Sequence, residues 1–138
     1  ELIEKLKKVA TELDIMDRIK WRNYIADEDL ANVYRSPGVF AMPSRYEPFG
    51  MVAIEAMACG TQVIATDCPS GPFEILEGGK WGTLVPVDDV ESLSEALNLS
   101  LGNITPRFAV EERAMTFSVD RAVSEYQVLI DSLSCQKR

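Results

Sequence analysis

Short apolar segments alternate with segments of helical periodicity along this chain, and this alternation restricts the fold more than any other feature. Apolar residues recur at helical spacing over residues 2–13, 27–34, 49–59 and 90–99, and the strand candidates lie at 18–21, 39–42, 62–65 and 82–85. Short strands that alternate with helices form a parallel sheet with helices on both faces. We therefore expect an α/β, Rossmann-like fold.

Individual residues mark where the helices begin or end. Asp27 is expected to be the N-cap of the second helix, and Gly60 the left-handed residue that follows the third. The C-terminal helices are expected over about 104–134, with a break near Phe117 and Ser118. Because 138 residues are too few for two ordinary domains, we treat 1–138 as a single domain.

Charge and composition argue against several classes of function. The formal net charge of −8 does not suit a groove for duplex nucleic acid, because phosphate contacts need clustered Lys and Arg. No apolar run reaches the roughly 18 residues of a membrane-spanning helix. The absence of histidine excludes a histidine base or histidine metal site, and three cysteines without a CxxC pair suit a reduced, cytoplasmic protein.

The loop at residues 43–50 joins a buried strand to an almost wholly apolar helix. Ligands of such sheets bind beyond the carboxyl ends of the strands, so this loop is a candidate site. Pro48 suits the first helical position, which would leave the amides of Phe49, Gly50 and Met51 unpaired. Together with the helix dipole, these amides predict an anion site able to hold a diphosphate.

Glu55 is the one charged residue between Gly50 and Gly60. A buried carboxylate needs hydrogen-bond donors, and the two hydroxyls of a ribose would supply a bidentate pair. Glu47, eight residues earlier, would then lie nearer the sugar. The alternative is that Glu55 marks a solvent-facing stripe of the helix and that Glu47 is an ordinary loop carboxylate.

The run from Glu47 to Ala65, EPFGMVAIEAMACGTQVIA, resembles the E-x7-E signature of retaining glycosyltransferases of the GT-B fold, family 4. Residues 29–34 and 81–86 resemble the segments that flank the signature in that family, so the resemblance covers almost the whole chain. It implies an N-terminally truncated, nucleotide-sugar-binding part of the C-terminal domain of a GT-B enzyme.

The resemblance also implies roles for individual residues. Glu47 would be the catalytic glutamate that contacts the donor sugar, Glu55 would bind the ribose, and the amides of residues 49–51 would contact the diphosphate or the sugar. Arg45 would assist the anion, although an exposed, solvated arginine is the alternative. The family needs no metal or other cofactor for its diphosphate, and Asp88 and Asp89 are expected to cap the following helix.

The activity implied is retaining transfer of a hexose or N-acetylhexosamine from a nucleoside diphosphate sugar, expected to be UDP-linked. Residues 67–76 resemble a loop of enzymes that assemble bacterial polysaccharides and lipid-linked oligosaccharides, which implies a glycan or lipid-linked acceptor in polysaccharide biosynthesis.

Family members carry an Arg and a Lys that clamp the phosphates in two earlier strand and helix units, and these units have no counterpart here. We therefore expect the chain to be inactive alone and to require an N-terminal acceptor domain or partner subunit, through which any peripheral membrane association would arise. We also expect it to self-associate. The alternative is a non-catalytic, flavodoxin-like module that binds a nucleotide or a partner.

Overall fold

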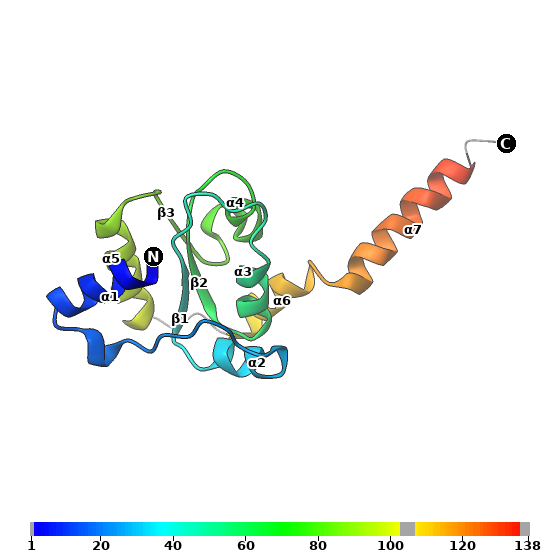
Figure 1. Ribbon diagram of the computed structural model, residues 1–138. Coiled ribbons are helices and arrows are strands. Elements are labelled where there is room, and N and C mark those ends of the chain that lie inside the picture. Colours follow the sequence, from blue (N-terminus) through cyan, green and yellow to red (C-terminus); the bar gives the residue numbers. More distant parts are fainter. Residues whose placement is uncertain (1, 103–106, 136–138) are drawn as a thin grey trace.

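The computed structural model describes residues 2–102 and 107–135, and a parallel sheet forms its centre (Figure 1). The sheet has three strands, which lie in the order β1 (Val39–Met42), β2 (Gln62–Thr66) and β3 (Thr83–Val85). Phe40 pairs with Val63 in the first ladder, and Ala65 pairs with Leu84 in the second. The three strands predicted at 39–42, 62–65 and 82–85 are therefore confirmed to within one residue.

Helices cover both faces of the sheet, as the alternation of segments predicts (Figure 1). One face carries α3 (Met51–Ala58) and α6 (Arg107–Met115), and against α3 pack α2 (Asp27–Arg35) and α4 (Pro72–Ile75). The other face carries α5 (Val90–Gly102). Side chains of β2 alternate between the two layers, because Val63 and Ala65 join the core beneath α3 while Ile64 packs with Val85 and Ala96.

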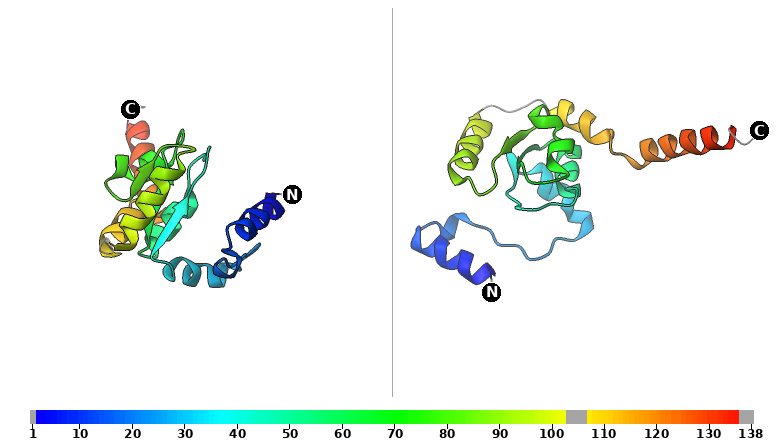
Figure 2. Two further views of the ribbon diagram at one scale, coloured as in Figure 1. Left: turned by 90° about the vertical axis from the view of Figure 1, so that its left-hand side faces the viewer. Right: turned by 90° about the horizontal axis from the view of Figure 1, so that it is seen from above.

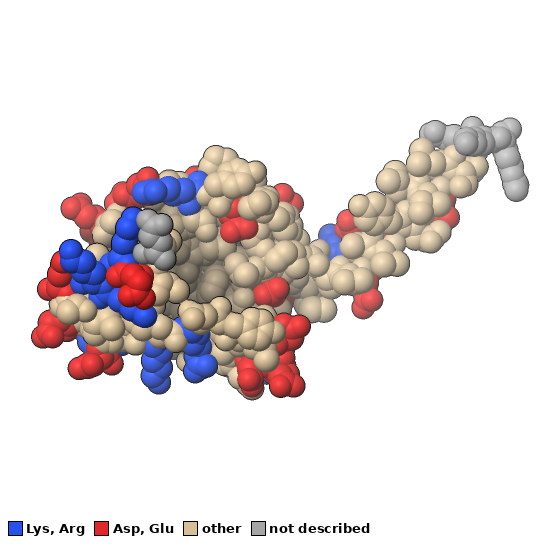
Figure 3. Space-filling model, in the orientation of Figure 1, with Lys and Arg blue, Asp and Glu red and all other residues tan. Residues whose placement is uncertain are grey.

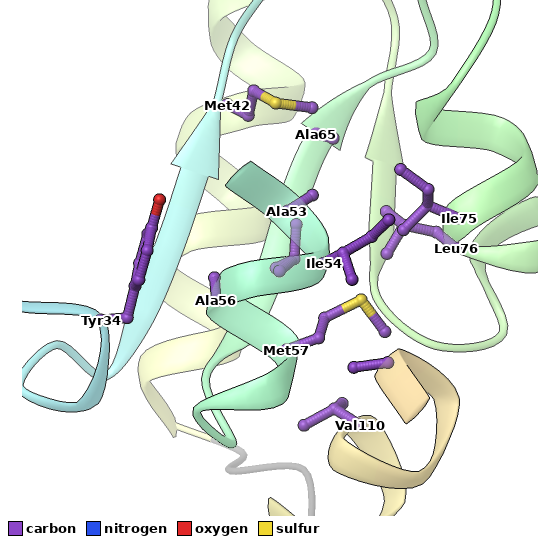
Figure 4. Packing of buried hydrophobic residues seen from close by; sticks show 12 residues of the cluster. Tyr34, Met42, Ala53, Ile54, Ala56, Met57, Ala65, Ile75, Leu76 and Val110 are labelled. Atoms are coloured by element: carbon purple, nitrogen blue, oxygen red, sulfur yellow. The ribbon is translucent and has the colours of Figure 1, made fainter. Parts of the chain in front are cut away.

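The larger core lies between α3, the sheet and α6 (Figure 4). Ala53 and Ala56 are completely buried, and these small side chains let α3 approach its neighbours closely. Met57 is also completely buried and fills the space beside Val110 of α6. Burying a large apolar side chain of this kind contributes roughly 1.5–3 kcal/mol to folding.

The strand predicted at 18–21 is wrong. The chain there forms the 3-10 helix η1 (Met16–Arg18) and then an irregular connection to α2. A strand needs a neighbour for its backbone N–H and C=O groups, and within the described residues β1 pairs with β2 alone. The N-cap of α2 is also one residue earlier than predicted: Ala26 takes this position, and Asp27 opens the helix without a capping hydrogen bond.

The two terminal helices expose their apolar sides. Helix α1 (Leu2–Glu12) buries Ala10 alone, and helix α7 (Val119–Cys135) extends away from the rest of the molecule (Figures 1 and 2). More than half of each side chain is exposed along an apolar stripe of α7 made of Val119, Val123, Tyr126, Ile130 and Leu133. Charged side chains crowd the body of the molecule, whereas the visible face of α7 is mostly uncharged (Figure 3).

The predicted C-terminal helices correspond to α6 and α7, which are separated by the predicted break at Phe117 and Ser118. Residues 104–106 of the predicted region lie outside the described residues. Within the described ranges, no helix combines the length and apolar character needed to cross a membrane.

Candidate functional site

The loop at residues 43–50 leaves the carboxyl end of β1 and is held there by the neighbouring strand. Thr66, the last residue of β2, donates its hydroxyl to the carbonyl oxygen of Ser44 and lies 3.5 Å from that of Met42. Both Thr66 and Met42 are buried. The start of the loop is therefore anchored to the sheet before the chain turns into α3.

Helix α3 begins at Met51 and not at Pro48, which corrects the predicted start. Gly50 is the N-cap, and its φ of +101° lies in the left-handed region, so this residue turns the chain and cannot belong to the helix. Pro48 therefore lies in the loop. The predicted role of Pro48 as the first helical residue is wrong, because the turn occurs two residues later.

The amides at the start of α3 nevertheless remain available. Ala53 donates to the carbonyl oxygen of Gly50 at 2.9 Å, but in the described part of the chain no acceptor pairs with the amides of Phe49, Gly50, Met51 or Val52. The first three are the predicted anion donors, and Val52 is an addition that follows from the later helix start. Unpaired amides at a helix N-terminus favour an anion.

A second loop fixes the position of Phe49. Gly71 lies so close to this residue that a Cβ on Gly71 would be 1.5 Å from the carbonyl oxygen of Phe49. From the other side, the ring of Phe49 meets the ring of Phe117 edge-on, with 6.0 Å between the centroids. The segment that leads into α3 is thus held between the loop after β2 and the chain that follows α6.

Arg113 of α6 binds the short helix α4, which follows this second loop. Its guanidinium donates to the carbonyl oxygens of Ile75 at 3.0 Å and Glu74 at 2.7 Å, and it lies 4.6 Å from the centroid of the Phe117 ring. The positive charge therefore meets carbonyl groups at the end of α4, where the helix dipole favours a cation.

Glu55 lies one helical turn after Met51, on the same side of α3. It is half-buried, and its Oε2 accepts a hydrogen bond of 2.9 Å from the hydroxyl of Tyr34 in α2. Burial of Tyr34, followed by the hydrogen bond and the charge of Glu55, raises the pKa of this phenol to about 12. Tyr34 is therefore a protonated donor at neutral pH.

A hollow of about 280 Å³ lies at the surface where α2 packs against α3, and Glu55 is one of the residues that line it. Its lining is mainly apolar and consists of Asp27, Leu30, Ala31, Tyr34, Glu55, Ala58 and Cys59. Glu55 thus lies at the wall of a concave, mostly apolar surface, where a few polar groups can orient a ligand. Glu55 is thus half-buried and hydrogen-bonded, rather than fully exposed on the helix.

Glu47 occupies a different environment, in the loop that precedes α3. It is half-buried, and a Cβ on Gly50 would be 3.4 Å from its Cγ. Within the described residues its carboxylate forms no hydrogen bond or ion pair. Glu47 therefore lies against the helix N-cap with its carboxylate unused, whereas Glu55 is one turn further along and is already engaged by Tyr34.

Arg45 forms an ion pair with Asp88, with 2.7 Å between Nε and Oδ1. This pair connects the loops that follow β1 and β3, but both side chains are exposed, so it contributes little to stability. Asp89 accepts hydrogen bonds from the backbone and the hydroxyl of Ser92, which hold the pKa of Asp89 below its usual value. The expected capping role is therefore confirmed for Asp89, while Asp88 pairs with Arg45.

The chain belongs to the family Glycosyl transferases group 1, which matches residues 2–115. Mannosylfructose-phosphate synthase of Agrobacterium fabrum is 39% identical over 92 residues, which cover 67% of this chain and 20% of that protein. D-inositol 3-phosphate glycosyltransferase of Mycobacterium sp. (strain KMS) is 38% identical over 137 residues, which cover 90% of this chain and 31% of the relative. The chain spans about a fifth to a third of the length of these relatives.

Solved structures agree with this assignment. Sucrose-phosphate synthase from Thermosynechococcus elongatus superposes with a TM-score of 0.80 and 32% sequence identity. The match covers 96% of this chain and 34% of the synthase chain. The Anabaena protein HepE, solved in complex with UDP, matches 96% of this chain and 36% of its own with a TM-score of 0.76 and 26% identity. The structural neighbours are GT-B glycosyltransferases, so the predicted fold class is confirmed.

Proposed function

We propose that this chain provides the donor site of a retaining glycosyltransferase that uses a nucleoside diphosphate sugar. The observation that carries the proposal is the start of α3, where unpaired amides lie one helical turn from Glu55 and its hollow. The similarity to a protein solved with UDP supports a uridine nucleotide as the donor moiety. The donor would be a UDP-linked hexose or N-acetylhexosamine, and the acceptor a glycan or lipid-linked saccharide in polysaccharide biosynthesis.

In this proposal the diphosphate lies at the amides of residues 49–52. Amides that are already oriented stabilise the negative charge that grows on the diphosphate as the sugar departs, without having to reorganise. Gly50 has no side chain between the ligand and the backbone. No metal or other cofactor is required, since the helix terminus supplies the electrostatic stabilisation, and the departing phosphate would accept the proton of the acceptor hydroxyl.

The two glutamates would divide the recognition of the donor. Glu55 would accept hydrogen bonds from the ribose hydroxyls in the hollow between α2 and α3. Glu47, whose carboxylate has no partner in the described chain, would contact the hydroxyls of the sugar. Arg45 would add a positive charge only after leaving Asp88, so we assign it a smaller contribution.

We further propose that an acceptor-binding domain or subunit covers the exposed apolar sides of α1 and α7, and that it provides any contact with a membrane surface. The free thiols of Cys59 and Cys68 are compatible with action in the cytoplasm. Without this acceptor-binding half, the isolated chain should be inactive and should self-associate through the same apolar sides.

The test is to incubate the full-length protein with UDP-glucose, UDP-N-acetylglucosamine and GDP-mannose and to measure nucleotide release, followed by NMR of the anomeric configuration of the product. Release of UDP with retention at the anomeric carbon is expected. If no donor is turned over and UDP does not raise the melting temperature, a flavodoxin-like binding module becomes the better description.

A further inference from the structure

Tyr34 is held in place by three separate elements of the fold. Thr61, between α3 and β2, donates its hydroxyl to the carbonyl oxygen of Tyr34. Phe40 of β1 meets the tyrosine ring edge-on, with 5.6 Å between the centroids. The hydroxyl of Tyr34 reaches Glu55 on α3, and only 7% of the residue is exposed. The tyrosine therefore has little freedom of its own.

Glu55 has more conformational freedom than Tyr34, because a glutamate has three side-chain torsions and this residue lines a hollow at the surface. The hydrogen bond from Tyr34 reaches Oε2 and leaves Oε1 unbonded within the described residues. A carboxylate can accept about four hydrogen bonds, so the phenol uses one site and leaves both oxygens able to accept more. The bond restricts the carboxylate without blocking it.

We infer that Tyr34 is a positioning residue, which fixes the orientation of the Glu55 carboxylate so that a ribose diol can bind it without first ordering the side chain. This inference rests on the proposed function of Glu55. Ordering a long side chain at the moment of binding costs affinity, and a carboxylate that is already oriented avoids part of that cost. The high pKa of Tyr34 keeps its proton in place at every pH at which the enzyme would work.

The competing explanation is that the hydrogen bond serves folding alone, because a buried phenol and a half-buried carboxylate satisfy one another. Both explanations predict that removing the hydroxyl lowers stability. They differ in ligand binding. Only a positioning role predicts a loss that is confined to ligands with a ribose, since Glu55 is not expected to contact a bare diphosphate.

The experiment measures the affinity of the full-length protein for UDP and for inorganic pyrophosphate by titration calorimetry. The variants are Tyr34→Phe, Glu55→Ala and the double variant, with Tyr126→Phe on the exposed α7 as the matched control. We expect Tyr34→Phe to lower the affinity for UDP about 3- to 10-fold, while the affinity for pyrophosphate changes less than about twofold. The double variant should bind UDP no more weakly than Glu55→Ala, because the tyrosine acts through the glutamate.

Each result is decisive. If Glu55→Ala leaves UDP affinity unchanged, the proposed function of Glu55 fails and the inference fails with it. If Glu55→Ala weakens the binding of UDP but Tyr34→Phe does not, Tyr34 is structural only. The same conclusion follows if Tyr34→Phe weakens the binding of UDP and of pyrophosphate equally. Should Tyr34→Phe fail to fold, the wild-type protein with 13Cζ-labelled tyrosine provides the second measurement: the Tyr34 signal should shift with UDP and stay in place with pyrophosphate, and the absence of a UDP shift overturns the inference.

Discussion

Helices α3 and α7 are both rich in apolar residues, yet they have opposite environments. In α3 four residues are buried, and the segment just before the helix is held by the loop after β2 and by Phe117. In α7 no described side chain is buried, although Val119, Val123 and Ile130 follow a regular apolar stripe. Apolar periodicity identifies a helix and the side that needs covering, but the rest of the fold decides whether anything covers it.

The largest effect expected in the packed region follows from replacing Gly71 by alanine. A Cβ there would be 1.5 Å from the carbonyl oxygen of Phe49, so the two loops would have to separate. We expect Gly71→Ala to lower the free energy of unfolding by at least about 3 kcal/mol, as measured by urea denaturation. Gly102→Ala is the control, since no atom of the described residues lies within 4 Å of its Cβ position. Equal stability of the two variants would show that the loop contact is dispensable.

Two isoleucines allow a direct comparison of the packed and exposed regions. Ile75 is completely buried near the site, whereas 54% of Ile130 on α7 is exposed. In the isolated chain, at a dilution at which it is monomeric, we expect Ile75→Ala to cost about 2–5 kcal/mol and Ile130→Ala less than about 0.5 kcal/mol, by urea denaturation. In the full-length protein, a larger cost for Ile130→Ala would show that α7 is covered there. A cost that stays small would contradict the proposed covering of α7.

The division of work between the glutamates should appear as a difference between ligands. Glu55→Ala in the full-length protein should weaken the binding free energy of UDP by roughly 1.5–3 kcal/mol, because a charged hydrogen-bonding partner is lost. Glu47→Ala should lower turnover of the nucleotide sugar and spare the affinity for UDP. Calorimetry and a turnover assay measure the two effects, with Glu125→Ala on α7 as the control. If both variants lose UDP affinity and turnover to the same extent, the assignment of separate roles is wrong.

The smallest effect concerns Asp89, which precedes α5 and binds Ser92. Its pKa is lower in the folded chain than its usual value, so the stabilisation is present at neutral pH and is lost as the pH falls through the folded pKa. Asp89→Ala should therefore lower the melting temperature slightly at pH 7, and the difference from wild type should shrink as the solution is acidified. A difference that is independent of pH would mean that charge is not involved.

The sequence predicted the elements that obey local rules. Residues 39–42 form a strand as expected, and Gly60 follows α3 with a φ of +74°. The short apolar run and the glycine signal each depend on neighbouring residues alone. The strand expected at 18–21 failed because a strand also needs a partner, and no local pattern shows whether one is present.

The site was predicted less completely than the fold. The isolated charge of Glu55 identified this residue, but its bond to Tyr34 joins positions 21 apart in sequence and depends on how α2 packs against α3. The contact between Gly71 and Phe49 joins residues that are similarly far apart in sequence, and spacing alone could not predict it. A glycine beside a proline, as at Gly71, indicates a turn. This pattern does not predict which group the glycine contacts.

The order of strands in the sheet has a consequence for how the protein folds. Both ladders join strands that are consecutive in the chain, so the unit of β1, α3 and β2 occupies only residues 39–66. Closing a short segment loses less chain entropy than closing a long one, and local pairing favours rapid folding. The loop at 43–50 lies inside this unit. The backbone of this loop should therefore form with the first pair of strands, while its contacts with Gly71 and Phe117 wait for the segments that follow β2.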